Sequence, residues 1–83
     1  MPYIHKNSRL TLADPINAPA SPGGLNYVIT TKSDTYLKHV GVSYSTINEV
    51  IGVLECAKLE LYRRIAAPYE DKKLAENGDV YTV

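Results

Sequence analysis

The chain has 83 residues, and its 9 Lys and Arg side chains balance 9 Asp and Glu side chains, so its formal net charge is zero. This balance gives no basic excess that would draw the protein to nucleic acid or to an anionic membrane, and we expect no sequence-specific nucleic acid partner. A chain this short forms one small domain that buries only about 60% of its unfolded surface. No apolar stretch is long enough to cross a membrane. The single cysteine, Cys56, excludes a disulfide framework and a cysteine-based zinc site.

Residues 1–24 are predicted to form an irregular arm and residues 25–83 a helical domain. The segment 13–24 holds three of the five prolines and two of the five glycines, and proline lacks a backbone donor and disfavours helix in the residue before it. One interpretation is a flexible or surface-hugging arm. The other is an arm that packs on a partner subunit, because its apolar side chains would otherwise be exposed; these are Leu10, Leu12 and Ile16.

A first helix is predicted over residues 25–39, with Asn26 as its capping residue and Gly41 in the left-handed position after its end. At 100° per residue, one apolar side can be traced along this helix. Its members are Leu25, Val28, Ile29, Tyr36 and Val40. Several Thr and Ser residues make the helix marginal without tertiary packing.

A second, longer helix begins near residues 43–46, with a weak capping-box pattern formed by Thr46 and Glu49. It is predicted to run to about Ala66, where Ala67 and Pro68 stop it. Its apolar positions follow the 3.6-residue period. They are Ile47, Val50, Ile51, Leu54, Ala57, Leu61 and Ile65, with a smaller opposite stripe of Gly52, Cys56 and Leu59. Two apolar stripes indicate that this helix is contacted on two sides, and in so short a chain the second contact points to another subunit. No heptad pattern is sustained, so we do not expect a coiled coil.

A short third helix is predicted over residues 69–76, with Pro68 in its first turn and Gly78 after its end. The tail, residues 79–83, alternates polar and apolar residues and is interpreted as a short strand or an extended strap. The predicted fold is therefore all-α: two main helices and a short third follow an irregular N-terminal arm, and the whole forms a homo-oligomer.

The densest charged region, and the predicted ligand-binding site, lies where the second helix meets the third. Two arginines, two lysines and two tyrosines there have the chemistry to clasp a phosphate, a nucleotide or an acidic partner. They are Tyr62, Arg63, Arg64, Tyr69, Lys72 and Lys73. The alternative is structural, because arginines near a helix C-terminus complement its dipole and neighbouring acidic residues offset the charge.

Two further groups of polar residues lie on the long helix. Glu55, Lys58 and Tyr62 are three and four residues apart, which suits either a polar ligand or an intrahelical ion pair whose lysine stem covers apolar surface. Glu60 and Arg64 are spaced as an i,i+4 surface pair.

Metal chemistry has one candidate. The spacing of Glu76 and Asp79 resembles the Glu-x-x-Asp element of the all-α nucleoside triphosphate pyrophosphohydrolases, and with Glu55 it would supply hard oxygen ligands for magnesium. The carboxylates of the long helix, Glu49, Glu55 and Glu60, depart from that family because they are five or six residues apart. We therefore expect no catalytic residue, cofactor or metal.

The stretch from residue 25 to residue 81 resembles a family of small uncharacterised bacteriophage proteins. The matching segments are 25–30 (LNYVIT), 43–60 (SYSTINEVIGVLECAKLE), 62–64 (YRR), 67–73 (APYEDKK) and 76–81 (ENGDVY). Residues 10–24 depart from the family, in which a more helical, acidic segment is usual. The resemblance implies a phage origin and action in the host cytoplasm, without supplying an activity.

These observations lead to the hypothesis of a non-catalytic phage protein that antagonises a bacterial defence system by sequestering a small phosphorylated nucleotide. Tyr62 or Tyr69 would stack on the base, and the basic residues would hold the phosphate. One alternative is direct inhibition of a host defence protein, and another is a magnesium-dependent pyrophosphohydrolase.

Overall fold

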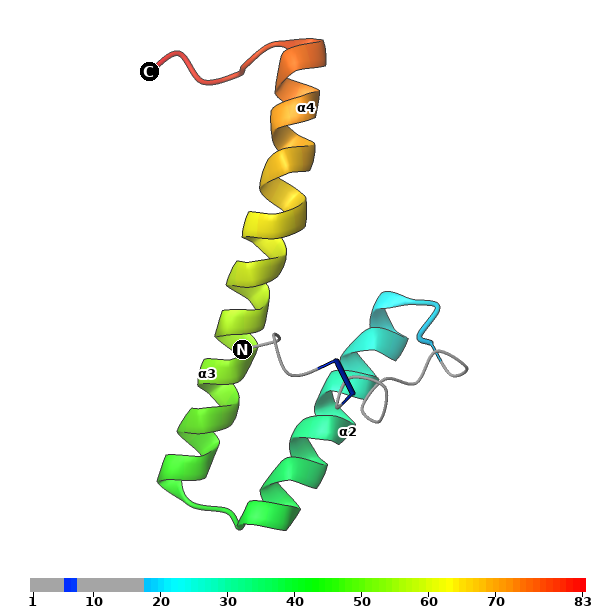
Figure 1. Cartoon of the computed structure of the whole chain (residues 1–83), viewed down its shortest axis with the longest axis vertical. Helices are drawn as coiled ribbons and strands as arrows, with labels where there is room; N and C mark the ends of the chain where they lie inside the picture. The colour runs from blue at the N-terminus through cyan, green and yellow to red at the C-terminus, as the bar shows by residue number, and fades with distance from the viewer. Residues whose placement is uncertain (1–5, 8–17) are drawn as a thin grey trace.

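The computed structural model describes residues 6–7 and 18–83, and the part of the chain that it describes contains helices and no strand, as the all-α prediction requires (Figure 1). The predicted contacts of the arm, made by Leu10, Leu12 and Ile16, lie outside the described residues. The tail after Asn77 has no regular structure, and it contains an Asx-type turn in which the Tyr81 backbone N–H donates to Asp79 Oδ1 at 2.8 Å.

Helix α2 spans Pro22–Val40 and begins three residues earlier than predicted. The prediction of Asn26 as its cap is wrong, because the Ser21 hydroxyl accepts the N–H of Gly24 at 3.0 Å. Pro22 suits the first helical turn, where its missing N–H costs nothing and its fixed φ is already helical. Gly41 ends the helix with a φ of 92°, and its N–H donates to the Leu37 carbonyl at 2.8 Å.

Helix α3 spans Tyr44–Leu61 and carries a complete capping box, formed by Ser43 and Thr46 rather than by Thr46 and Glu49. The Thr46 N–H donates to Ser43 Oγ at 3.1 Å, and the Ser43 N–H donates to Thr46 Oγ1 at 2.9 Å. The box therefore satisfies two backbone donors that the start of a helix leaves unpaired.

The predicted stop at Ala67 and Pro68 is wrong, because helix continues through it (Figure 1). A π-helical turn, η1, spans Tyr62–Ala66 and leads directly into α4, which spans Ala67–Asn77. In this turn the Ala67 N–H donates to the Tyr62 carbonyl, five residues back. Proline normally clashes with the carbonyl four residues before it. Here it occupies the first turn of α4 directly after the π turn, so the rod from α3 to α4 is not broken.

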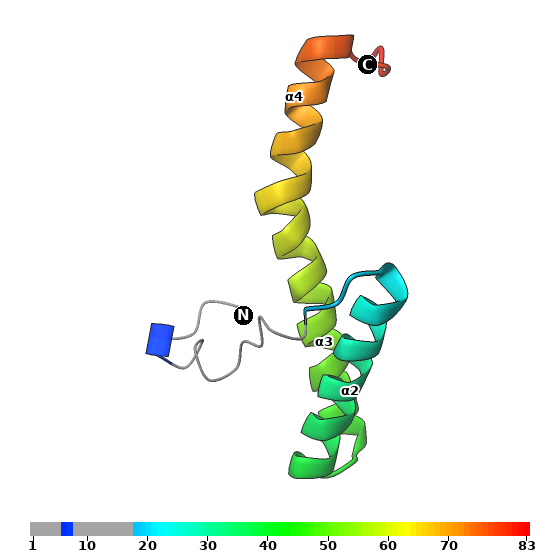
Figure 2. The same cartoon turned by 90° about the vertical axis from the view of Figure 1, so that its right-hand side faces the viewer.

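Helices α2 and α3 form an antiparallel hairpin, and α4 extends the rod beyond the N-terminal start of α2 (Figures 1 and 2). The radius of gyration is 16.9 Å, against about 12 Å for a compact domain of this length. Among the described residues no side chain is buried. The hairpin therefore lacks a core of its own in this part of the chain.

Candidate functional site

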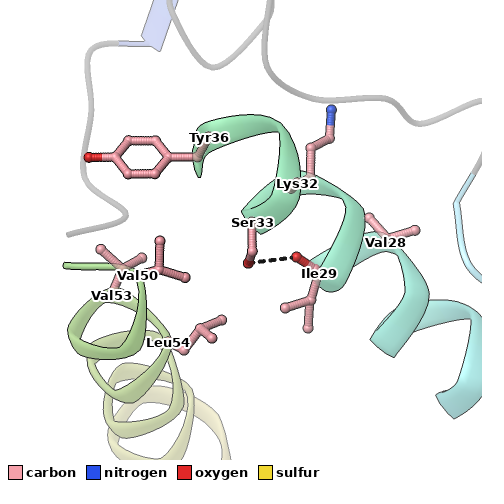
Figure 3. Close-up of a pocket in the computed structure, with 8 residues that line it drawn as sticks. All are labelled: Val28, Ile29, Lys32, Ser33, Tyr36, Val50, Val53 and Leu54. Carbon is pink, nitrogen blue, oxygen red and sulfur yellow. Dashed lines mark hydrogen bonds between the residues drawn. The ribbon is translucent and has the colours of Figure 1, made fainter. Parts of the chain in front are cut away.

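An apolar groove lies between α2 and α3 and has a volume of about 400 Å³ (Figure 3). Eight residues line it: Val28, Ile29, Lys32, Ser33, Tyr36, Val50, Val53 and Leu54. The first five belong to α2 and the last three to α3, so the two helices build the groove together. Its size is that of a site for a small ligand or for a few side chains of a partner.

The polar groups of the groove are satisfied by the hairpin itself, with one exception. Ser33 Oγ donates back to the Ile29 carbonyl at 2.8 Å (Figure 3). The Tyr36 hydroxyl donates to Glu49 Oε2 at 2.9 Å, and this hydrogen bond raises the pKa of Tyr36 above its ordinary value of 10.0. Lys32 makes no ion pair with the described residues, and its ammonium points away from the α3 side chains (Figure 3). The groove thus offers an apolar wall and one cation.

The predicted basic site lies elsewhere, around η1 and along α4, and several of its groups already bind carboxylates. Arg63 Nη2 bonds both oxygens of Glu60, at 2.9 and 3.1 Å. The Tyr62 hydroxyl donates to Glu70 Oε2 at 3.2 Å, which raises the pKa of Tyr62. A phosphate would therefore have to displace carboxylates from Arg63 and Tyr62.

Two of the predicted residues, Tyr69 and Lys73, are brought together. Lys73 Nζ lies 5.6 Å from the centre of the Tyr69 ring, a cation–π distance, and also pairs with Glu76 at 3.4 Å. Arg64 and Lys72 make no ion pair with the described residues. None of the six predicted residues lines the groove.

The π turn sets the direction of the side chains on α4. Residues eight apart point about 80° away from each other on an uninterrupted α-helix. The hydrogen bond between Tyr62 and Glu70 spans eight residues. Because i,i+5 bonding reduces the rotation per residue, the π turn reduces the angle between the two side chains, so that Tyr62 and Glu70 lie closer to the same face of the rod.

The other polar groups on the long helix form local pairs. Lys58 Nζ lies 3.1 Å from Glu55 Oε1, in agreement with the ion-pair interpretation. Glu60 pairs with Arg63, three residues later, and not with Arg64 as predicted.

The structure separates Glu55 from Glu76, two of the three predicted magnesium ligands. Glu55 and Glu76 stand about 30 Å apart along one rod of helix, at 1.5 Å per residue. Within the described ranges no group of three or more His, Cys, Asp or Glu side chains is placed to hold a metal ion. Magnesium-dependent hydrolysis thus stays a prediction.

Sequence reasoning did not single out the groove. Its apolar members Val28, Ile29 and Tyr36 were on the predicted stripe of the first helix, but Lys32 and Ser33 carried no motif. The signal that could have found them is the i,i+4 spacing of Val28, Lys32 and Tyr36, which places the lysine in the same row as two groove residues.

The chain belongs to the family described as Domain of unknown function (DUF6899), whose model matches residues 1–80. No curated protein and no solved structure matches it. In the described part of the chain, no helix combines the length and the apolar character needed to span a membrane.

Proposed function

We propose that this protein is a non-catalytic binding protein whose α2–α3 groove takes an apolar helical segment of a partner protein. The observation that carries the proposal is the groove itself, because its walls are almost entirely aliphatic and aromatic. Helix-in-groove recognition requires such a surface, into which anchors at positions i, i+3, i+4 and i+7 of an amphipathic helix can insert.

The positive charge of Lys32 at the groove narrows the class of helical segment that would bind there. Ser33 and Tyr36 donate their hydroxyl hydrogens within the hairpin, so they do not need a hydrogen-bond acceptor from a ligand. Lys32 is the groove residue whose charge a partner would complement. The preferred segment therefore carries a carboxylate beside its apolar anchors, which favours encounter and fixes its direction.

If the chain is a phage protein, as its resemblance to small phage proteins implies, the partner proposed here is a host defence protein in the host cytoplasm. Binding without catalysis is sufficient for such antagonism, because a partner whose working surface is covered cannot act. The proposal therefore takes direct inhibition of a host protein as the function that the groove supports best.

A charge-swap experiment tests this proposal. The probe is a fluorescent amphipathic peptide of about 14 residues, four helical turns, with Leu anchors and one Glu at their edge, and its matched control has Lys in place of Glu. Fluorescence anisotropy should show that the wild type prefers the Glu peptide by roughly two- to fivefold, as an exposed charge pair allows. Lys32→Glu should reverse the preference. Equal affinities in all four combinations would contradict the proposed groove.

Sequestration of a nucleotide is a second candidate, favoured by the cation–π pair of Tyr69 and Lys73 and by Arg64 and Lys72, which make no ion pair with the described residues. An aromatic ring beside cations suits a base and its phosphates. Calorimetry against cyclic and linear nucleotides tests it, with Tyr69→Leu as the weakened variant. The absence of heat with every nucleotide would remove this candidate and leave the groove proposal standing.

A further inference from the structure

One side of α3 has the spacing of a coiled-coil seam over its whole length. Six residues follow one another at intervals of three and four: Tyr44, Ile47, Ile51, Leu54, Lys58 and Leu61. In heptad terms the first, third and fifth are a positions and the others are d positions. Ile65 continues the spacing into the π turn. The seam is short, so it qualifies the expectation that no heptad pattern is sustained in this chain.

The seam is not covered by the described part of the hairpin. Ile51 is 60% exposed and Leu61 is 62% exposed. The groove toward α2 uses a different side of α3, since its α3 residues are Val50, Val53 and Leu54 and only Leu54 belongs to both. A partner on the seam would therefore share one contact residue, Leu54, with the groove.

The accessible surface of the chain is larger than that of a compact monomer of the same mass. The chain exposes 7528 Å², whereas a compact monomer of 9.2 kDa exposes about 4,900 Å². The excess of about 2,600 Å² exceeds the roughly 800 Å² that each partner contributes to a standard interface.

We infer that a second copy of this chain covers the seam, so that α3 packs against α3 of its partner in a homodimer. A symmetric interface needs a surface that is complementary to itself, and a regular row of a and d side chains is such a surface. Ile51 at an a position with Leu54 and Leu61 at d positions matches the preference for two strands, and Ile47 is the d position that departs from it.

Lys58 gives the seam its specificity. A lysine at a single a position selects oligomer state and register at a cost in stability. Its ion pair with Glu55 at 3.1 Å provides a countercharge next to the seam, and its aliphatic stem can cover apolar neighbours. The ion pair of Lys58 with Glu55 and its apolar stem, both expected from the sequence, thus acquire a role at an interface.

Sedimentation velocity on the full chain tests the inference with two matched substitutions. Ile51 and Leu59 lie on α3 and are 60% and 56% exposed, but only Ile51 belongs to the seam. The wild type should sediment with twice the 9.2 kDa chain mass. Ile51→Glu should raise the dissociation constant of the dimer roughly 100-fold, because the change acts twice in a symmetric interface, whereas Leu59→Glu should leave it within about threefold.

A second variant keeps the test decisive if Ile51→Glu also unfolds the chain. Lys58→Leu replaces the charged a residue with an apolar one and should lower the dissociation constant roughly tenfold. A wild type with the mass of one chain would overturn the inference. So would equal effects of Ile51→Glu and Leu59→Glu, or a Lys58→Leu dimer no tighter than the wild type.

Discussion

Tyr36 on α2 and Glu49 on α3 are joined by a hydrogen bond of 2.9 Å from the phenol to the carboxylate, and in the described part of the chain this is the side-chain hydrogen bond that links the two helices. It crosses beside the groove that both helices line, and the Tyr36 ring extends over Val50 and Val53 (Figure 3). One residue therefore contributes both to the hairpin geometry and to the proposed binding surface.

The first prediction concerns alkaline pH. The neutral phenol of Tyr36 donates to Glu49, and ionisation removes that donor and creates a repulsion, so the pKa of Tyr36 is raised above 10.0. A raised folded-state pKa contributes stability that is fully present below the unfolded value and is lost as pH rises through the folded value. Stability of the hairpin should therefore fall above pH 10, and Tyr36→Phe should remove part of that fall.

Thermal unfolding followed by circular dichroism at neutral pH and above pH 10 measures the effect. Tyr27→Phe is the matched control, because Tyr27 lies on the same helix and has no side-chain hydrogen bond with the described residues. If both variants keep the same alkaline slope as the wild type, the link between Tyr36 and Glu49 does not contribute to stability.

The second prediction concerns the start of α3. Ser43→Ala removes the side-chain acceptor of the capping box and should lower the free energy of unfolding by about 1 kcal/mol. Ser45→Ala, two residues later and inside the helix, should be neutral or slightly stabilising, because alanine is the better helix former. Urea titrations of the two variants against the wild type provide the comparison. A larger loss from Ser45→Ala than from Ser43→Ala is incompatible with the observed cap.

The third prediction concerns affinity in the groove. Val53→Glu places a carboxylate among the apolar lining, where partner binding would have to remove water from it. Affinity for the Glu-bearing peptide should fall roughly tenfold or more, with the sedimentation coefficient unchanged because Val53 is outside the seam. Leu59→Glu, also on α3 but outside the groove, is the control. Unchanged peptide affinity in Val53→Glu would exclude this groove as the docking surface.

Local signals in the sequence predict much of the fold. Gly41 and Gly78 end α2 and α4 as expected, each with a positive φ, because helix ends favour glycine in that conformation. The start of the long helix near Ser43 is also confirmed. In contrast, Ser21 was missed as a cap because Pro22 and the glycines after it are more typical of a loop than of a first helical turn.

The remaining features depend on geometry that local patterns do not contain. A proline after an apolar helix normally predicts its end, and only the hydrogen-bond shift of the π turn explains why the rod continues through Pro68. The groove depends on how α2 lies against α3, because this packing brings Lys32 of α2 and Val53 of α3 into the same lining. Residue spacing within one helix cannot supply that relationship.

The most direct test of binding at the groove is an NMR titration of the Glu-bearing peptide into the full chain with labelled methyl groups. The methyls of Val28, Val50 and Val53 should shift progressively and saturate together, while those of Leu59 and Val80, which lie outside the groove, should stay in place. Shifts centred on Leu59 or Val80, or saturating peptide with no shift at the groove methyls, would contradict the proposed function.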